Sequence, residues 1–346
     1  MDIVHDFFNQ NGGGENLVKS IKKLSKGKIF TAFTKKKKNK EKFIFQSKIN
    51  KILQLNVFFV FIYFAYFFKL HSKDIILFSG NHCCFSINRC VAKKKYLYAH
   101  SLPKLLFSEL YMDIKSNPIF YAFKKKLINR YYNNLINLDK IFFNSIKTKN
   151  KFLYAFPNLD KKVNLEVLYP FSDFEFIEKK ESNTNKKNIY FVINSRHQSS
   201  KNIFQILLLI KPLLDRYKNI KLYITQEGSE TKNLQNLYPE NKQIIYTGYI
   251  NFENYKKLLL NCTAVIFPSR DEDFGIAALD AYNLNVPVII QRNCGFSEIL
   301  HEEYKFFYND NNFFDVIKKT LNQNNDDPYK NKINLRNIFL EKLQNI

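Results

Sequence analysis

Short apolar runs alternate with helical stretches through the second half of the chain. Residues 189–193 (Ile-Tyr-Phe-Val-Ile) form a continuous apolar run, which is typical of a strand buried on both faces. Further strands are predicted at residues 221–225, 243–246, 264–267 and 287–290, and helices at residues 202–217, 252–260 and 276–284. This alternation predicts right-handed crossovers and a parallel sheet with helices on both faces.

The first half shows the same pattern less regularly. Strands are predicted at residues 2–8, 74–78, 95–99, 140–143 and 165–168, and a helix at 15–24 follows the glycine loop Gly12, Gly13, Gly14. The polar stretch 178–187 is interpreted as a linker. We therefore expect one domain over residues 1–177, a second over 188–330, and a final helix in 331–346 that packs back on the first domain.

The longest apolar run covers residues 57–68, between Asn56 and Lys69. It is shorter than the roughly 20 apolar residues of a membrane-spanning helix. A run of this length predicts a buried core helix, and a segment lying in the membrane interface is the alternative. The first six residues contain no basic region and no cleavage site, so we expect no signal peptide.

The net charge of +23 comes from 54 Lys and Arg against 31 Asp and Glu. Such a charge favours polyanionic partners: nucleic acid, an anionic membrane surface or phosphorylated ligands. A general bias of the chain toward Lys, Asn, Ile and Phe is the competing explanation. The run Lys35 to Lys38, continued by Lys40 and Lys42, is either a solvated face or a contact with acidic lipids. No nucleic-acid-binding motif is present, so we do not expect a nucleic-acid partner.

Five cysteines occur, an odd number whose spacing suits no disulfide framework. This indicates a reducing cytoplasm. Zinc binding by Cys83, Cys84 and Cys90 is a minor alternative, because no second Cys or His pair stands at ligand spacing. No metal site is expected.

Two cations follow the predicted strand that ends at Asn194. Arg196 and Lys201 stand five positions apart at the start of a helix. A helix start carries free N–H groups and a partial positive charge, so this arrangement suits a pyrophosphate. By themselves, the two residues are better explained as ordinary surface cations of a basic protein.

A second motif, residues 272–280, follows the strand that ends at Pro268-Ser269. Gly275 permits close approach of a ligand to the backbone, and the carboxylates of Glu272 and Asp280 can accept hydrogen bonds from sugar and ribose hydroxyls. The alternative is that these acidic residues only stabilise the start of a helix by interacting with its dipole. The stretch Asp271-Glu272-Asp273 is also a D-x-D pattern, which would hold Mg²⁺ or Mn²⁺ in a different transferase fold.

Together these motifs resemble the C-terminal domain of the retaining GT-B glycosyltransferases of family 4, the group 1 glycosyl transferases. The matching positions are Arg196, Lys201, Pro268, Ser269, Glu272, Phe274, Gly275 and Asp280. The opening strand and its glycine loop are similar to the opening segment of this family. The segment His100-Ser101-Leu102-Pro103 is similar to a His-Thr/Ser-Pro segment of its mannosyltransferase-like members. Asp280 departs from the family, in which Glu is usual.

The resemblance implies a GT-B architecture, with two Rossmann-like parallel-sheet domains facing a cleft. It implies that Arg196 and Lys201 bind the donor diphosphate, that Glu272 contacts the donor sugar, and that Asp280 holds the ribose. Phe274 and Gly275 would also bind the donor. The catalytic residues would be His100, beside the donor sugar, with Arg196, Lys201 and Glu272. Gly12, Gly13 and Gly14 would form the acceptor loop.

The implied reaction is metal-independent transfer with retention. The expected donor is a nucleotide sugar, such as GDP-mannose, with no further cofactor. The acceptor would be a glycan or lipid-linked carrier in surface-polysaccharide or lipopolysaccharide synthesis, at the cytoplasmic face of the membrane. A non-catalytic, glycosyltransferase-like binding or scaffold protein is the alternative.

Overall fold

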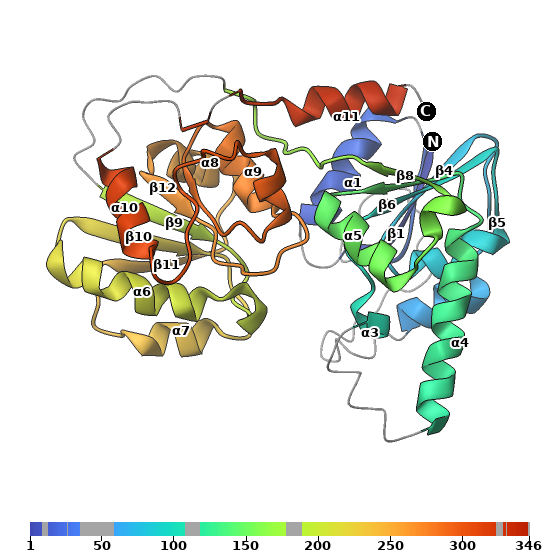
Figure 1. The fold of residues 1–346 in the computed structure, drawn as a ribbon, viewed down its shortest axis with the longest axis horizontal. Coiled ribbons are helices and arrows are strands. Elements are labelled where there is room, and N and C mark those ends of the chain that lie inside the picture. The colour runs from blue at the N-terminus through green and yellow to red at the C-terminus, as the bar shows by residue number, and fades with distance from the viewer. Residues whose placement is uncertain are drawn as a thin grey trace. The chain divides into compact units, whose positions relative to one another are not determined.

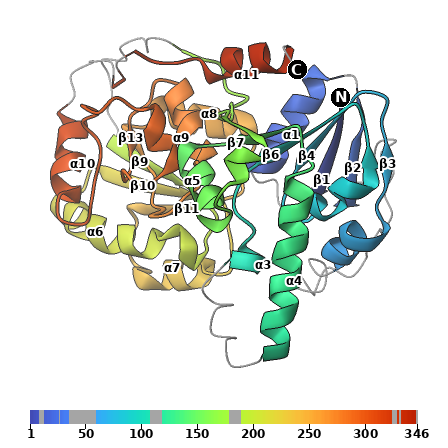
Figure 2. The ribbon, with the colours of Figure 1, turned by 45° about the vertical axis from the view of Figure 1, so that its right-hand side comes forward.

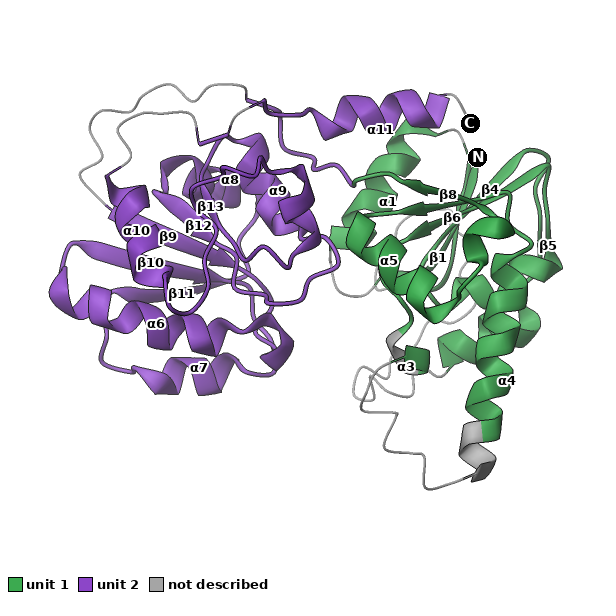
Figure 3. Ribbon diagram, viewed as in Figure 1, with its two compact units in different colours: residues 1–169 green, residues 170–346 purple. Residues whose placement is uncertain are grey.

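The structure is a computed structural model that describes residues 1–8, 13–25, 27–34, 59–107, 118–177, 189–322, 328–329 and 331–344. The chain forms two compact units, Met1–Tyr169 and Pro170–Ile346 (Figure 3). Each unit is built on a parallel sheet, as the alternation of strands and helices predicts.

Unit 1 contains a six-stranded parallel sheet with the order β2-β1-β4-β6-β7-β8 (Figure 1). The strands are β1 (Asp2–Phe8), β2 (Ile29–Thr34), β4 (Ile75–Ser79), β6 (Lys94–Ala99), β7 (Lys140–Phe143) and β8 (Asn164–Val167). Two short strands, β3 (Leu70–His71) and β5 (Cys90–Val91), pair separately. The helical segments are α1 (Gly13–Leu24), η1 (Tyr63–Phe67), η2 (Cys83–Arg89), α3 (Lys104–Phe107), α4 (Pro118–Leu135), α5 (Ile146–Ala155) and η5 (Leu159–Lys161).

Unit 2 contains a five-stranded parallel sheet with the order β11-β10-β9-β12-β13. Its strands are β9 (Ile189–Asn194), β10 (Ile220–Thr225), β11 (Ile244–Gly248), β12 (Ala264–Ile266) and β13 (Val288–Ile289). Helices α6 and α7 lie on one face of this sheet and α8 and α9 on the other (Figures 1 and 2). The helical segments are η6 (Ser199–Lys201), α6 (Ile203–Arg216), α7 (Thr231–Leu237), α8 (Phe252–Asn261), α9 (Ile276–Asn283), η7 (Gly295–Ile299), α10 (Phe313–Leu321) and α11 (Leu335–Gln344).

Helix α6 illustrates why these segments fold as they do. Its buried side chains recur every three or four residues and form one apolar stripe: Ile203, Ile206, Leu207, Ile210, Leu213 and Leu214. Burying each such side chain contributes about 1.5–3 kcal/mol. Pro212 lies inside α6, as the sequence predicts.

Alternation along the strands of unit 1 assigns residues to two faces of the sheet. Val4, Ile76, Leu97 and Ile141 belong to one buried cluster, which also contains residues of η1, η2, α4 and α5. The intervening side chains Ile3, Leu77, Tyr98 and Phe142 are buried on the opposite face. Helix α1, which contacts β1, is outside the first cluster and covers that second face.

The division between the units lies at Tyr169 and Pro170 rather than near residue 177. Residues 170–177 belong to unit 2 because they pack on its helices. The Phe174 ring stacks on Phe252 at 4.5 Å, and the Asn283 side-chain amide donates to the Phe174 carbonyl. The predicted linker, 178–187, lies outside the described residues.

Helix α11, in the stretch where the sequence predicts a final helix, groups with unit 2. Its packing on the first domain stays a prediction. Its Phe339 ring lies 4.9 Å from the ring of Phe171, in the segment just after the division. In addition, Lys332 donates to the carbonyls of Ile177 and Asn283.

The apolar run at 57–68 is only partly a buried helix. Within its described part, Val60, Phe61, Phe64 and Ala65 are buried, and residues 63–67 form a π-helical turn. Tyr63 and Phe68 are buried as well, whereas Phe59, Tyr66 and Phe67 are exposed, the last at 70%. Among the residues that the structure describes, no helix has both the length and the apolar character needed to cross a bilayer.

Candidate functional site

The first group of predicted residues lies at the carboxyl edge of the sheet in unit 2. Strand β9 lies at the centre of the sheet. Strands β10 and β11 follow it on one side, and β12 and β13 lie on the other, so β9 marks the point where the strand order reverses. In open α/β sheets, ligands bind beyond the strand ends at such a switch point. Arg196 and Lys201 follow β9, and Glu272 follows β12, so the topology places both predicted motifs at this edge.

Lys201 and Glu272 form an ion pair. The Lys201 ammonium lies 2.5 Å from Oε2 of Glu272, and the two side chains are 19% and 26% exposed. The next residue, Asn202, has a left-handed backbone conformation, and its side-chain amide donates to the Pro268 carbonyl at 3.2 Å. This bond ties the loop after β9 to the loop after β12, and so holds the cation and the carboxylate together.

Buried His197 positions Arg196. The two imidazole nitrogens of His197 lie 2.9 Å from Oγ1 of Thr231 and 3.2 Å from the Thr225 carbonyl. Burial lowers the pKa of His197. The ring thus anchors the loop from inside, while the Arg196 side chain before it remains half-buried.

The loop that carries Glu272 is held by its backbone and by one aromatic anchor. The Gly295 N–H donates to the Glu272 carbonyl at 3.1 Å, and the Phe296 N–H donates to the Phe274 carbonyl at 2.8 Å. The Phe274 side chain, predicted to line the donor, is only 2% exposed and packs edge-on against the Phe296 ring. The structure therefore gives the Phe274 ring an anchoring position in the core.

Gly275 begins the turn into α9 with a φ of 113°, which only glycine adopts without strain. A Cβ at this position would lie 2.8 Å from Cζ of Phe267, so space as well as conformation excludes a side chain. The close backbone approach expected from the sequence is present here.

Asp280 is held by a residue that the sequence analysis did not identify. The Ser172 hydroxyl donates to Oδ1 of Asp280 at 2.5 Å. Burial raises the pKa of Asp280 to about 7, with the Ser172 hydrogen bond opposing the rise. No sequence motif marks Ser172, which lies 108 positions from its partner.

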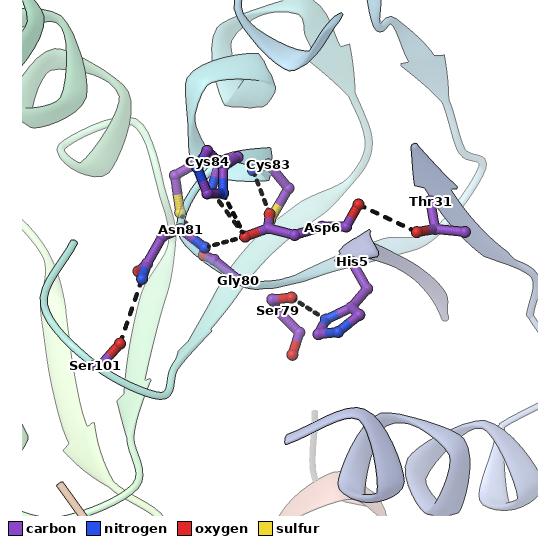
Figure 4. A network of polar contacts seen from close by, with 10 residues as sticks. His5, Asp6, Thr31, Ser79, Gly80, Asn81, Cys83, Cys84 and Ser101 are labelled. Carbon is purple, nitrogen blue, oxygen red and sulfur yellow. Dashed lines mark hydrogen bonds and ion pairs between the residues drawn. The ribbon is translucent and has the colours of Figure 1, made fainter. Parts of the chain in front are cut away.

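The second group of residues lies at the corresponding edge of the sheet in unit 1. The Asp6 carboxylate accepts hydrogen bonds from the backbone N–H groups of Asn81, His82 and Cys83 and from the His82 ring (Figure 4). Burial by itself would raise the pKa of Asp6. The electrostatic attraction of His82 and its hydrogen bonds to the carboxylate outweigh burial and keep this pKa below its ordinary value. Asp6 therefore fixes the turn from β4 into η2. The sequence assigns no role to Asp6, which lies inside β1, two residues before its end.

The same turn explains Gly80. Its φ of 148° lies in the left-handed region, and a Cβ there would come within 2.5 Å of Cγ of Asp6. The carboxylate can reach the three N–H groups only because this position has no side chain.

His100 lies just beyond β6 and contacts residues from three other segments. Its Nε2 is 2.7 Å from Oγ of Ser79, its ring lies 6.5 Å from the His5 ring, and a Cβ on Gly14 would be 3.5 Å from its Nδ1. Burial lowers the pKa of His100 to about 3, as does nearby His5, while Asp6 acts in the opposite direction. The structure thus brings His100 and Gly14 together; Gly13 begins α1, and Gly12 lies outside the described residues.

The chain is similar to known glycosyltransferases in sequence and in structure. Residues 173–337 match the family model of the glycosyl transferases group 1. The structure is similar over 99% of the chain to Alr3699/HepE from Anabaena in complex with UDP and glucose (TM-score 0.65, 13% identity, 98% of that chain). It is also similar over its full length to the lipopolysaccharide outer core galactosyltransferase WaaB (TM-score 0.59, 16% identity, 100% of that chain).

The chain has the GT-B fold. Sequence similarity is more local. An uncharacterized glycosyltransferase of Methanocaldococcus jannaschii, MJ1607, is 31% identical over 121 residues, which cover 34% of this chain and 30% of that protein. YqgM of Bacillus subtilis is 23% identical over 145 residues, which cover 41% and 40%. The match thus spans less than half the length of either relative.

No group of three or more His, Cys, Asp or Glu side chains converges on one point among the residues that the structure describes. Cys83, Cys84 and Cys90, the zinc alternative, have buried thiols, as do Cys262 and Cys294. Burial raises the pKa of both Cys83 and Cys90.

Proposed function

We propose that the protein is a glycosyltransferase that moves a sugar from a nucleoside diphosphate sugar onto a glycan or lipid-linked acceptor. The observation that carries the proposal is the Lys201–Glu272 pair at the switch point of the unit 2 sheet, within the segment that matches the glycosyl transferases group 1. A cation for the diphosphate and a carboxylate for sugar hydroxyls stand there side by side.

Arg196 and Lys201 would bind the diphosphate, and Glu272 would bind hydroxyls of the donor sugar. The leaving diphosphate gains negative charge as the glycosidic bond breaks, so these cations stabilise the transition state more than the ground state. Asp280 would accept a hydrogen bond from the ribose. The transfer would retain configuration, with the leaving phosphate assisting attack on the same face, and would need no metal ion because the two side chains supply the positive charge.

The donor is best identified by binding. The mannosyltransferase-like sequence features favour GDP-mannose, whereas the similar structure of HepE holds UDP and glucose. A thermal-shift screen should compare UDP, GDP, UDP-glucose and GDP-mannose. A ligand that binds only the folded protein adds about 2.7 kcal/mol of stability at 100 times its Kd.

The variant Lys201→Ala tests the site in the same screen. It should abolish the shift, whereas Lys211→Ala, which removes a lysine of an exposed helical pair with Asp215, should leave it unchanged. For the preferred donor, Arg196→Ala and Lys201→Ala should each lower turnover by about 10², comparable to losing one charge-stabilising group. Near-normal turnover in both variants contradicts the proposed phosphate role.

One observation favours a second candidate function, a protein of this fold that binds nucleotide sugar or glycan without transfer. Asp280 is one methylene shorter than the usual Glu, and the Ser172 hydroxyl already occupies Oδ1. A weakened ribose contact would follow. A donor-hydrolysis assay separates the two functions: nucleotide release from any donor supports the enzyme, and binding without release supports the non-catalytic protein.

The acceptor and location are proposed from unit 1. The exposed Tyr66 and Phe67 lie beside a cation, since the Arg130 guanidinium is 4.9 Å from the Tyr66 ring centre. Aromatic and basic side chains together suit an anionic membrane surface. We therefore propose a cytoplasmic enzyme of surface-polysaccharide or lipopolysaccharide synthesis that associates peripherally with the inner face of the membrane.

Vesicle binding tests the membrane part. The protein should sediment with phosphatidylcholine vesicles that contain phosphatidylserine, but not with phosphatidylcholine alone. Phe67→Ser should weaken sedimentation. Tyr154→Ser, at an aromatic residue of α5 that is 91% exposed, is the matched control and should have no effect. Equal losses in both variants, or equal binding to both vesicles, contradict this assignment.

A further inference from the structure

The carboxyl edge of the unit 1 sheet contains a serine between two histidines. Ser79 ends β4, His5 stands opposite it in β1, and His100 follows the neighbouring strand β6. Because side chains alternate along strands, all three project to the face that α1 covers. Ser79 is fully buried (Figure 4 shows it facing His5), so each of its polar groups needs a partner within the protein.

The Ser79 carbonyl determines the protonation of His5. Nδ1 of His5 contacts this carbonyl oxygen. A carbonyl only accepts hydrogen bonds, so Nδ1 of His5 must carry the proton. His5 therefore cannot supply a proton to His100 through Ser79.

The Ser79 hydroxyl determines the protonation of His100. Its Oγ lies 2.7 Å from Nε2 of His100, and in the described part of the chain this nitrogen is the acceptor within reach of the hydroxyl. The buried hydroxyl is satisfied only if it donates to Nε2, since in the reverse arrangement its own proton has no acceptor there. Burial also lowers the pKa of His100 to about 3, so the ring is neutral near pH 7 and carries one proton. That proton is then on Nδ1.

The Nδ1 edge of His100 faces Gly14 at the start of α1. A Cβ added to Gly14 would lie 3.5 Å from both Nδ1 and Cε1, so this ring edge meets the first turn of α1. The Tyr98 ring packs edge-on at 5.1 Å and helps to fix the imidazole plane. The N–H of His100 therefore points toward Gly14, one of the three glycines that the sequence assigns to acceptor binding.

We propose that Ser79 is a positioning residue that fixes the Nδ1–H tautomer of His100, so that His100 acts as a neutral hydrogen-bond donor to a substrate oxygen. A ring held in this tautomer cannot accept a proton at Nδ1, which excludes His100 as the general base on that side. The substrate part of this assignment rests on the proposed glycosyl transfer. The tautomer itself does not.

Nitrogen-15 NMR of the imidazole rings tests the tautomer in the intact protein. The protein contains six histidines, and the His100 signals are identified by their loss in His100→Gln. We expect a neutral ring with the proton on Nδ1 throughout pH 5–8. A ring with its proton on Nε2, or one that becomes charged in this range, overturns the proposal whether or not the protein transfers sugar.

Variants of Ser79 connect the tautomer to turnover. Ser79→Ala should give a mixture of the two tautomers and lower kcat by about tenfold, with little change in KM for the donor. Ser79→Thr keeps the hydroxyl and should restore both readouts. Ser86→Ala is the matched control, because Ser86 is equally buried but its hydroxyl donates to the Cys83 carbonyl.

The outcomes separate the two proposals. If Ser79→Ala shifts the tautomer but turns over like Ser86→Ala, the role of the tautomer in catalysis is refuted. If the wild-type protein binds and hydrolyses no donor, the proposed function fails, while the NMR measurement still decides the tautomer. Should Ser79→Ala fail to fold, the wild-type spectrum and Ser79→Thr remain decisive.

Discussion

Replacing Glu272 by glutamine should strengthen the binding of a nucleoside diphosphate while slowing sugar transfer. The Glu272 carboxylate lies 2.5 Å from the Lys201 ammonium, so it occupies the cation that we assign to the diphosphate. A bound phosphate would have to displace this carboxylate and would also be repelled by it. Glutamine has nearly the same shape and removes both penalties.

The size of the effect follows from the exposure of the pair. The two side chains are 19% and 26% exposed, which is intermediate between a surface pair and a buried one. Exposed pairs contribute about 0.2–1 kcal/mol, and removing one partner of a buried pair costs about 3–5 kcal/mol. We expect a gain of about 1 kcal/mol, which corresponds to about fivefold tighter binding of the diphosphate.

The nucleotide sugar should show the opposite effect. If Glu272 binds a hydroxyl of the donor sugar, glutamine replaces a charge-assisted hydrogen bond worth about 1.5–3 kcal/mol. The corresponding fall in kcat/KM is about 10- to 150-fold. A simple loss of folding would weaken both ligands, so opposite changes for the diphosphate and for transfer identify the role of this carboxylate.

Isothermal titration calorimetry with UDP and GDP measures the first effect, and steady-state transfer measures the second. Asp271→Asn is the matched control, because it removes the same charge from the exposed neighbouring residue. The reasoning is refuted if Glu272→Gln binds the diphosphate no more tightly than the wild type, or if Asp271→Asn strengthens binding equally.

Three further predictions concern the metal ion, the pH and one glycine. Transfer should survive EDTA, and loss of activity that Mn²⁺ restores would support the D-x-D alternative. The pKa of Asp280 is raised by burial to about 7 from 3.8, so the folded state holds this proton more tightly than the unfolded chain. This group should therefore lower the free energy of unfolding as the pH rises from about 4 to 7, by up to about 4 kcal/mol. Urea titrations at several pH values measure this dependence. It should be lost in Asp280→Asn and kept in the control Asp215→Asn. Gly80→Ala should destabilise the protein by at least about 1 kcal/mol, because its Cβ would come within 2.5 Å of Asp6. Gly14→Ala, whose Cβ makes only contacts of ordinary length, is the control, and equal stabilities of the two variants would contradict the steric argument.

Much of the fold was predictable because it follows from local patterns. The continuous apolar run at 189–193 became β9, and the stripe of α6 repeats every three or four residues. The strand β2 was missed. Its six residues, Ile-Phe-Thr-Ala-Phe-Thr, stand directly before the lysine-rich run, and only pairing with β1 identifies them as a strand.

The candidate site was predictable in part for the same reason. Arg196, Lys201 and Glu272 directly follow strand ends, and parallel strands bring their carboxyl ends to one edge. Lys201 pairs with Glu272, 71 positions away, because β9 and β12 are neighbours in the sheet. The sequence alone does not give this strand order. The buried position of the Phe274 ring against Phe296 likewise depends on the tertiary structure.

The sequence alone determined the alternation of strands and helices, the charge, and which residue types stand at the strand ends. These properties depend on neighbours in the chain. The long-range partners follow from the three-dimensional fold: Asp280 with Ser172, Asp6 with the turn after β4, and Ser79 with His100. The physical reason is that burial and long-range pairing set protonation and hydrogen bonding, and both depend on strand order and register rather than on distance along the chain.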